Sequence, residues 1–503
     1  KGVIKMSAII TEKFRAHNAN QFVESFTEAA ASTYYLFLGK STPFTSATSG
    51  GNDSSPPTPN DGSKSEHFAW DSMLGAKLIS SSDVSFSIPR RNWANGTIYD
   101  MYRHDYSASN TSTSGASNLY DSTFYFVTSD YRIYKVLDNN GGTAYSGSEP
   151  TSESTSLFAI GGYVLKYMYK ITASDFSKYG TTDFVSVATD STVATAATSG
   201  KIESLSITAG SGYTDGTYYA AVYGDGTSQG TSSGAIVRIT VSSGAIVSFG
   251  LTAGTDTTIE SGGSGYTFGY VNLGSTFTFS DADLTTSSSM GSGTGGAVEV
   301  IISPNDGHGN NAVTELGGHY VMAAVTLTQA EGDDFSTAND FRQVGIVVDP
   351  TNFGTSTVAT ATTRRQTYVV KLGSVSGTFE PDETITQATT GAVGKVVEWD
   401  STLGLLYYQQ ENFKGYGTNS TSGGYVAFST TAVITGGTSS ASGTPSSDTE
   451  TVTLLNNNTI SLTSGYANPE LAADSGDIIY LENRKPIQRA SDQTEDIKII
   501  IEF

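Results

Sequence analysis

The feature that most constrains the fold is the stretch 190–300, which is built almost entirely from Gly, Ser, Thr, Ala and β-branched residues. Within it, the run Gly-Ser-Gly-Tyr-Thr at 210–214 recurs at 263–267. Each copy is followed by a turn and an apolar, strand-like run. β-Branched residues suit strands and Gly suits the turns between them. The repeat therefore predicts two β modules made of hairpins, while low-complexity disorder is the alternative reading of the same composition.

Outside this stretch the chain shows the same preference for strands, with a few helical segments. Apolar residues spaced by three and four predict a helix over 12–30 and a second short helix that places Phe68, Met73, Leu74 and Leu78 on its apolar side. Strands are expected at 34–38, 84–88, 123–128, 131–137, 163–171 and 183–187. Ile497, Ile499 and Ile501 alternate with their neighbours and predict a C-terminal strand.

The predicted fold is mainly β and multidomain, with antiparallel sheets in a β-sandwich-like body, a few short helices and inserted Gly/Ser/Thr-rich β modules. Changes of composition near 190, 300, 355 and 475 divide the chain. Residues 6–190 form the N-terminal part of the body, 191–300 the inserted repeat-like modules and 301–355 the central part of the body. Residues 356–475 form a second inserted β region, and 476–503 a C-terminal strand that returns to the body.

Charge and composition exclude several classes of partner. The net charge of −22 repels phosphate backbones, so we expect no nucleic-acid partner. The chain has no Cys, which excludes disulfides and thiolate metal sites. No run approaches the roughly 20 apolar residues of a membrane span, so no membrane partner is expected. Met6 is a plausible natural start.

Motifs for catalysis or cofactor binding occur only outside their structural context. Gly291, Gly293 and Gly296 match G-x-G-x-x-G, but a strand rather than a helix is expected to follow. The G-x-S-x-G match at 230–234 leads into a hairpin rather than a helix. Asp306, His308 and His319 could in principle bind a metal, although a tight turn at 305–309 explains the first two better. We therefore expect no enzyme, no metal and no cofactor.

Three segments, in order along the chain, carry a family resemblance. The first runs from Met6 to Phe26 and on to Ile88-Pro89-Arg90-Arg91-Asn92-Trp93. The second runs from Gly307 to Phe341-Arg342-Gln343 and Pro350. The third joins Glu482-Asn483-Arg484-Lys485-Pro486-Ile487 to Asp492-Gln493-Thr494-Glu495. Together they resemble the baseplate wedge subunits, of the gene 8 product type, of T-even-like contractile-tailed bacteriophages. Asn92 stands where that family has Asp, and the two insertions have no counterpart in its shorter type protein.

The resemblance implies a structural subunit of the phage tail baseplate wedge. Such a subunit is a homodimer that binds other wedge subunits, scaffolds assembly and holds the baseplate before sheath contraction. It would be located in the virion, in the tail baseplate, after assembly in the host cytoplasm. The resemblance also implies that the protein is not an enzyme.

The residues that carry the resemblance are the candidate subunit-contact residues, namely Arg90, Arg91, Trp93, Phe341, Arg342, Asn483 and Arg484. Arg90 and Arg91 could bind a partner or could pair with carboxylates of this acidic chain. Trp93 fits the core better than an interface, and Asn483, Arg484 and Pro486 fit a turn before the last strand. The alternative function is a peripheral carbohydrate- or receptor-binding tail protein, in which Tyr213 and Tyr266 stack on sugars.

Overall fold

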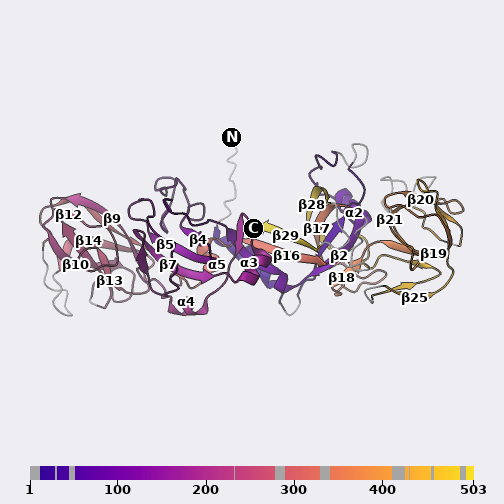
Figure 1. The fold of residues 1–503 in the computed structure, drawn as a ribbon. Helices are drawn as coiled ribbons and strands as arrows, with labels where there is room; N and C mark the ends of the chain where they lie inside the picture. The colour runs from indigo at the N-terminus through magenta and orange to yellow at the C-terminus, as the bar shows by residue number, and fades with distance from the viewer. Residues whose placement is uncertain are drawn as a thin grey trace, which may run out of the picture. The chain divides into compact units, whose positions relative to one another are not determined.

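The computed structural model describes residues 12–28, 31–44, 51–231, 233–277, 289–328, 340–410, 425–429, 431–454, 458–487 and 494–503. The chain divides into two compact units. Unit 1 contains residues 1–21, 85–322 and 500–503, and unit 2 contains residues 22–84 and 323–499. Figure 1 labels many of the helices and strands of both units.

Helices are few and short in the described parts of the chain. They are α1 (Glu12–Glu24), α2 (Ser63–Ser72), α3 (Ala173–Tyr179), α4 (Ser191–Ala196) and α5 (Ala312–Leu316), with one 3₁₀ turn, η1 (Ser81–Asp83). Side chains of Thr172, Asp190 and Asn311 accept backbone N–H bonds at the starts of α3, α4 and α5, which fixes where these helices begin. None of the described helices is long and apolar enough to cross a membrane.

The first part of unit 1 is built on a four-stranded sheet of order β4-β5-β7-β6. Its strands are β4 (Tyr125–Val127), β5 (Arg132–Asp138), β6 (Phe158–Ile160) and β7 (Tyr163–Lys170). Buried tyrosines fill its core, and their hydroxyls reach loop carbonyls: Tyr134 donates to Ser152 at 2.8 Å and Tyr163 to Thr143 at 2.8 Å. A buried tyrosine is stable only when its hydroxyl has such a partner.

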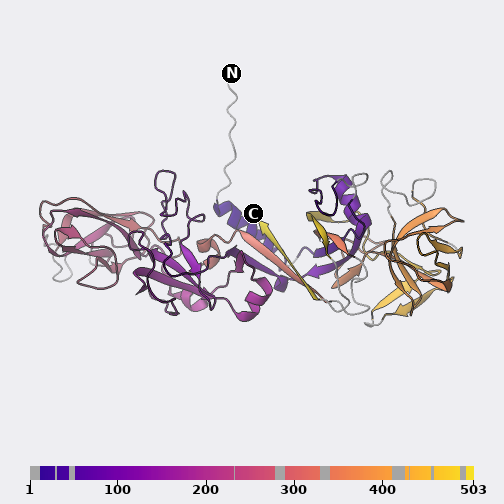
Figure 2. The ribbon, with the colours of Figure 1, turned by 45° about the horizontal axis from the view of Figure 1, so that its top comes forward.

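A second four-stranded sheet has the order β29-β16-β3-β8. It contains β3 (Val84–Pro89), β8 (Phe184–Ser186), β16 (Tyr320–Thr328) and the C-terminal β29 (Thr494–Glu502). β16 and β29 lie side by side in Figure 2, and each contributes residues to both units. Ile497 and Ile499 are buried, as the predicted alternation requires.

The stretch 204–301 of unit 1 folds into its own strands. They are β9 (Ser204–Ser211), β10 (Gly216–Gly224), β11 (Ala235–Ser242), β12 (Ala245–Ile246), β13 (Thr258–Gly262), β14 (Gly269–Phe277) and β15 (Thr294–Ile301). β9 pairs with β15 from Ser204↔Ile301 onward, which closes the segment at its base. The remaining strands form one sheet of order β12-β11-β10-β14, with β13 against β11. The described residues are thus folded strands, not low-complexity disorder.

The two copies of the repeat do not make two separate modules, and that prediction is wrong. β10 and β11 come from the first half and β13 and β14 from the second, yet they share one sheet. Each repeat places a tyrosine inside this module. The Tyr213 hydroxyl accepts the Gly296 N–H at 3.1 Å, and the Tyr266 hydroxyl accepts the Ala235 N–H at 3.1 Å. Only glycine fits at position 210, because a Cβ there would lie 2.4 Å from the Gly296 nitrogen.

Unit 2 is built on a five-stranded sheet of order β18-β2-β1-β17-β28. Its strands are β1 (Tyr34–Gly39), β2 (Met73–Ile79), β17 (Phe341–Val348), β18 (Thr363–Arg365) and β28 (Asp477–Ile487). The predicted helix through Met73 and Leu78 is wrong beyond Ser72, because the chain leaves α2 there and pairs with β1 on one side and β18 on the other. Its apolar residues are buried as a run rather than on one helical face.

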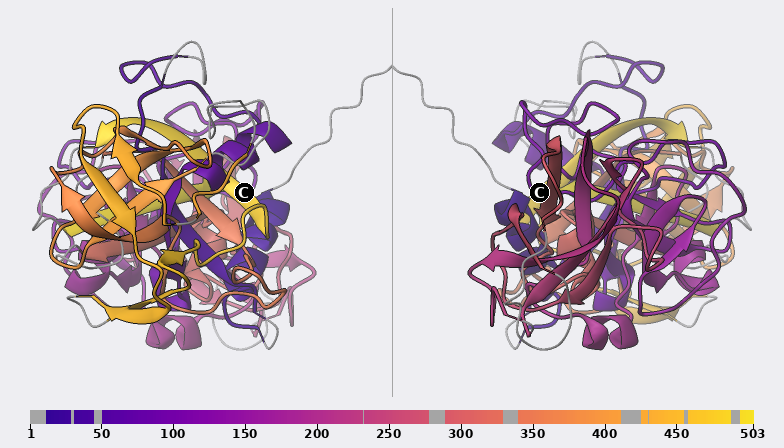
Figure 3. Two further views of the ribbon diagram at one scale, coloured as in Figure 1. Left: turned by 90° about the vertical axis from the view of Figure 1, so that its right-hand side faces the viewer. Right: turned by 90° about the vertical axis from the view of Figure 1, so that its left-hand side faces the viewer.

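The rest of unit 2 holds a seven-stranded sheet of order β22-β21-β20-β23-β24-β19-β27 and the two-stranded β25-β26. These strands are β19 (Tyr368–Ser376), β20 (Thr384–Gln387), β21 (Ala392–Asp400), β22 (Leu405–Gln409), β23 (Ile434–Gly436), β24 (Ser442–Pro445), β25 (Glu450–Thr453), β26 (Thr459–Leu462) and β27 (Tyr466–Ala467). β19 pairs with β27 at Val369↔Ala467, so this segment also closes on itself. The left view of Figure 3 faces these strands, in orange and yellow.

The predicted fold class is confirmed: the described chain is mainly β, with antiparallel sheets, short helices and more than one compact unit. The division into units differs from the division predicted from composition. Residues 6–190 fall in both units, and the stretch 191–300 lies within unit 1 beside 85–190. β18 (363–365) belongs to the sheet of β1 and β2, although composition assigned it to the second insertion.

Candidate functional site

Arg90 and Arg91 follow β3 and are both half-buried. The Arg90 side chain donates to Asn92 Oδ1 at 2.8 Å and to the Thr181 carbonyl at 3.0 Å, and it lies over the Phe176 ring. The predicted pairing of Arg90 with a carboxylate is not found among the described residues.

Arg91 is held in a similar way, without a carboxylate partner in the described part of the chain. Its side chain donates to the Tyr120 carbonyl at 2.8 Å and stacks on the Tyr125 ring, with 4.4 Å between the guanidinium carbon and the ring centroid. A guanidinium that donates to a carbonyl group and lies over an aromatic ring is attracted to both, so it holds together the segments that carry them. Both arginines therefore fasten the 85–185 region together.

Trp93 lies at the margin of the unit 1 core. Its backbone N–H donates to the Val127 carbonyl at 2.8 Å, and its ring meets Tyr145 edge to face at 5.7 Å. The neighbouring Asn92 forms a parallel bridge with Val127. This placement agrees with the expectation that Trp93 packs in the core.

Phe341 and Arg342 begin β17 in unit 2, and both are buried. The Arg342 side chain donates from Nε to Asp53 at 3.0 Å and from Nη1 to the Ser41 carbonyl, and Nη2 lies 3.7 Å from Asp340. A buried guanidinium is tolerated only when its charge and its donors are matched, as here. Arg342 therefore ties β17 to the loops at 41 and 53.

Asn483 and Arg484 lie in β28, so the predicted turn at these residues and at Pro486 is wrong. The reason is that β28 pairs with β17 along most of its length, which keeps the chain extended. Asn483 accepts from Gln343 Nε2 at 2.8 Å and donates to the Pro57 carbonyl at 2.8 Å. Arg484 is exposed, and its nearest carboxylate is Glu482 at 3.6 Å.

A buried ion pair in unit 1 was missed by the sequence reasoning. Lys135 on β5 and Glu315 on α5 form it with side-chain exposures of 0% and 2%. Glu315 also accepts the backbone N–H groups of Gly309 and Asn311. Burial, partly offset by Glu315, lowers the pKa of Lys135. The sequence feature that could have indicated this ion pair is Lys135 itself, a lysine inside the apolar run of β5, which the structure places directly opposite Lys166 of β7.

His308 lies beside this pair, in the predicted turn. It is 0% exposed and meets the Tyr102 ring edge to face at 4.9 Å. Neither of its ring nitrogens has a hydrogen-bond partner among the described residues. Burial, with the positive charges of Lys135, Lys166 and Lys201, holds the pKa of His308 well below its ordinary value. Within the described residues no group of three or more His, Asp or Glu is arranged to hold a metal.

Residues 8–147 and 452–503 match the sequence pattern of the Phage-Gp8 family, described as "Bacteriophage T4, Gp8". These two segments are similar to the Gp8 family. The similarity supports a structural role in the tail baseplate of a T4-like phage, in association with other baseplate proteins. A comparison with curated proteins finds no match.

The Gp8 match covers part of the candidate residue set. Arg90, Arg91 and Trp93 lie in the first matched segment, and Asn483 and Arg484 lie in the second. Phe341 and Arg342 lie outside both. The structure brings Arg90, Arg91 and Trp93 together in unit 1, and it brings Asn483 beside Gln343, the neighbour of Arg342, in unit 2.

The tyrosines named for sugar stacking lie inside the fold. Tyr266 is 2% exposed and Tyr213 is half-buried, and both hydroxyls hold backbone groups. The Tyr266 ring is therefore not available as a stacking surface, and the alternative function is wrong for this residue, whereas the Tyr213 ring is only partly covered.

Proposed function

We propose that this chain is a non-catalytic, homodimeric subunit of the baseplate wedge, which scaffolds wedge assembly and holds the baseplate before sheath contraction. The match of both terminal segments to the Gp8 family carries the proposal. The internal use of the signature side chains supports it. Arg90, Arg91 and Arg342 are bound to carbonyls, rings and a carboxylate of their own chain, as expected of groups that stiffen a scaffold.

The outer edge of β28 is the surface we propose for self-association. β28 is the last strand of its sheet and is eleven residues long. An unpaired strand edge is a ready template for another chain. Ile479 on this strand is 48% exposed, and Arg484 and Lys485 are exposed as well. In a chain with a net charge of −22, these two exposed cations on the same strand reduce the repulsion between copies.

The test compares Ile479→Asp with Val433→Asp. Both are exposed apolar residues of unit 2, at 48% and 49%, but Val433 lies outside the segments that match Gp8. A charge at Ile479 should convert the dimer to monomer and prevent entry into wedges, whereas Val433→Asp should leave both unchanged. Light scattering after size exclusion gives the mass, and co-purification with wedge proteins gives the assembly. A wild-type monomer, or equal behaviour of the two variants, would contradict the proposal.

A deletion tests whether the insertion in unit 1 is needed. Ile207 and Val298 are paired across β9 and β15, so residues 208–297 can be replaced by a short Asn-Gly turn. The shortened chain should remain a soluble dimer that enters wedges. A monomer from this deletion would place the dimer contact in the insertion instead of in β28.

A further inference from the structure

Unit 1 contains a groove of about 650 Å³ that belongs to neither of the contacts above. Its walls are β14 at Gly269–Gly274 and β15 at Gly296–Val300, and the loop Arg103–Asp105 completes it. β14 and β15 each end their sheets in the strand order, so their facing edges have no partner strand in the described structure. The volume lies within the roughly 300–1,000 Å³ typical of small-ligand sites.

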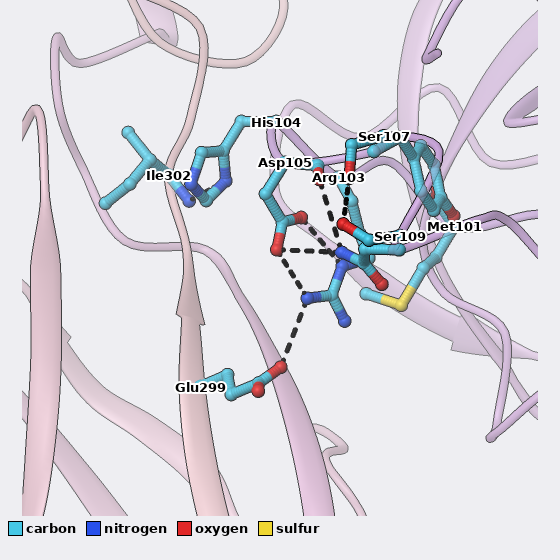
Figure 4. Close-up of polar contacts among 10 residues, drawn as sticks. Met101, Arg103, His104, Asp105, Ser107, Ser109, Glu299 and Ile302 are labelled. Atoms are coloured by element: carbon cyan, nitrogen blue, oxygen red, sulfur yellow. Dashed lines mark hydrogen bonds and ion pairs between the residues drawn. The ribbon is translucent and has the colours of Figure 1, made fainter. Parts of the chain in front are cut away.

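A fixed group of charges lines the groove (Figure 4). Arg103 donates to both carboxylate oxygens of Asp105, at 2.9 and 2.7 Å, and to Glu299 at 3.1 Å. The Arg103 side chain is only 14% exposed, whereas Asp105 and Glu299 are 38% and 56% exposed. A forked pair of this kind holds its partners in one orientation. The group therefore presents oriented carboxylate oxygens, which accept hydrogen bonds, with a net charge of −1.

An aromatic ring stands on the β14 wall. Tyr270 is 56% exposed, and its ring stacks on that of Tyr223 across the strand pair, with centroids 5.9 Å apart and an interplanar angle of 30°. Asp225 accepts the backbone N–H groups of Thr267 and Phe268, which anchors the start of this strand. An exposed ring held in one orientation offers a flat apolar face beside the carboxylates.

These features fit a neutral ligand that is rich in hydroxyl groups. Hydroxyls donate to carboxylate oxygens, and the C–H face of a sugar ring packs on an aromatic ring. The net negative charge of the lining disfavours anions. We propose that the groove binds a neutral oligosaccharide, with a sugar ring against Tyr270 and sugar hydroxyls donating to Asp105 and Glu299.

An extended peptide is the competing occupant, because peptides can add to free strand edges. The β14 edge is poorly suited to that role. Its pairing with β10 shifts register between Ala220 and Val222, and the Gly274 N–H is already bound by its neighbour Asn272 at 3.0 Å. Regular strand addition needs an unbroken row of free backbone groups. The irregular edge therefore favours a ligand bound by side chains.

The groove lies where the Gp8-matched segment meets the insertion. Arg103, His104 and Asp105 belong to the matched residues 8–147, whereas both strand walls lie in the unmatched part. His104 Nδ1 accepts the N–H of Ile302, just after β15, at 3.1 Å, which fixes this junction. The proposed site is thus an addition to the scaffold, and it is independent of the dimer contact proposed for β28.

The test uses the full-length chain on an array of neutral and anionic hexose oligosaccharides, followed by titration calorimetry with the strongest neutral oligosaccharide. Wild type should bind neutral oligosaccharides. Tyr270→Ala should weaken binding by roughly three- to tenfold, the amount expected for one lost stacking contact, and Glu299→Gln should also weaken it. Phe353→Ala is the matched control, because this aromatic residue of unit 2 is 46% exposed, and it should bind like wild type.

Three results would overturn the proposal. They are the absence of binding to any neutral oligosaccharide at millimolar concentration, binding of anionic oligosaccharides alone, and equal affinity of Tyr270→Ala and wild type. A photo-crosslinking residue at position 272 tests whether the groove is instead occupied by an extended peptide. Crosslinking to another protein in assembled tails would assign the groove to a peptide contact. Binding is measured on the isolated chain, so the result can be interpreted even if the wedge or dimer proposal fails.

Discussion

Replacing His308 by Phe tests the electrostatics of the unit 1 core. The histidine is fully buried, contacts the Tyr102 ring, and has no hydrogen-bond partner for either nitrogen among the described residues. A phenyl ring has nearly the same shape and leaves no polar atom without a partner. We therefore expect His308→Phe to be at least as stable as wild type at neutral pH, although most core substitutions are destabilising.

The larger effect should appear in acid. The pKa of His308 is held well below 6.5 in the folded protein by burial and by Lys135, Lys166 and Lys201, while the unfolded chain titrates near 6.5. Below pH 6.5 the unfolded state binds a proton at this residue that the folded state does not. Stability therefore falls as the pH falls, by at most about 1.4 kcal/mol per unit, which is the limit for one proton. The phenylalanine variant lacks this loss.

The measurement needs a signal from unit 1 alone, because a chain with two compact units need not unfold in one step. The protein has three tryptophans, and Trp93 belongs to unit 1 whereas Trp70 and Trp399 belong to unit 2. In a Trp70→Phe/Trp399→Phe background, Trp93 fluorescence reports urea unfolding of unit 1. The difference in free energy of unfolding between His308→Phe and its parent should grow from pH 7 to pH 5, to a limit of about 2 kcal/mol for one proton.

Other groups titrate in the same range, and the comparison removes them. Burial raises the pKa of Asp138 to about 6, which makes the folded state less stable as the pH rises through 4 to 6, the opposite sign. This contribution is present in both proteins and cancels. His17→Phe serves as the control, because His17 is exposed, and it should change nothing. Parallel pH curves for His308→Phe and its parent, or a variant destabilised at pH 7, would refute the reasoning.

Three further substitutions have definite expected outcomes. Lys135→Met should cost about 3–5 kcal/mol in urea unfolding, because it strands the buried Glu315 carboxylate. Adding Glu315→Gln removes the charge, keeps an acceptor for the Gly309 and Asn311 N–H groups, and should recover part of the loss; an equally unstable double variant would contradict this. Tyr266→Phe should cost about 1–3 kcal/mol, because its buried hydroxyl holds two backbone groups, while Tyr270→Phe should be neutral in the same assay. Asn92→Asp, which restores the residue typical of the family, should change stability by less than about 1 kcal/mol, because it only converts the exposed bond to Arg90 into a surface ion pair; a larger change in the thermal midpoint would show a further partner.

Local pattern was enough to predict strands but not their partners. The strand-like runs around 123–137 and 163–171 predicted β4, β5 and β7, because each of these strands buries one continuous run of residues. The helix predicted through Met73 failed because spacing in an apolar run cannot distinguish a helical face from a strand buried on both sides. Residues 73–79 form a strand because they pair with β1 and with β18, and β18 is far away in sequence. The same holds for the repeat, whose halves share one sheet.

The candidate residues show a similar limit. The sequence identified Arg90, Arg91 and Arg342 as important, but it could not show that carbonyls and rings, rather than carboxylates, receive the first two. Lys135 and Glu315 are 180 residues apart, so no spacing rule connects them. The one available sign was a lysine within an apolar strand. A buried cation requires a partner, but the sequence does not say where that partner lies.

The way the segment 204–301 closes explains how the rest of unit 1 can carry it. Ser204 pairs with Ile301, so this segment leaves and rejoins the fold at neighbouring positions about 5 Å apart. An insertion with adjacent ends does not stretch or displace the strands that flank it. The family-matched residues 8–147 can therefore keep the contacts of Arg91 while this insertion varies. The groove beside Arg103 follows from the same geometry, because a loop of the scaffold meets two unpaired strand edges of the insertion. The assembly proposed for the scaffold and the ligand binding proposed at its junction with the insertion can therefore be tested separately.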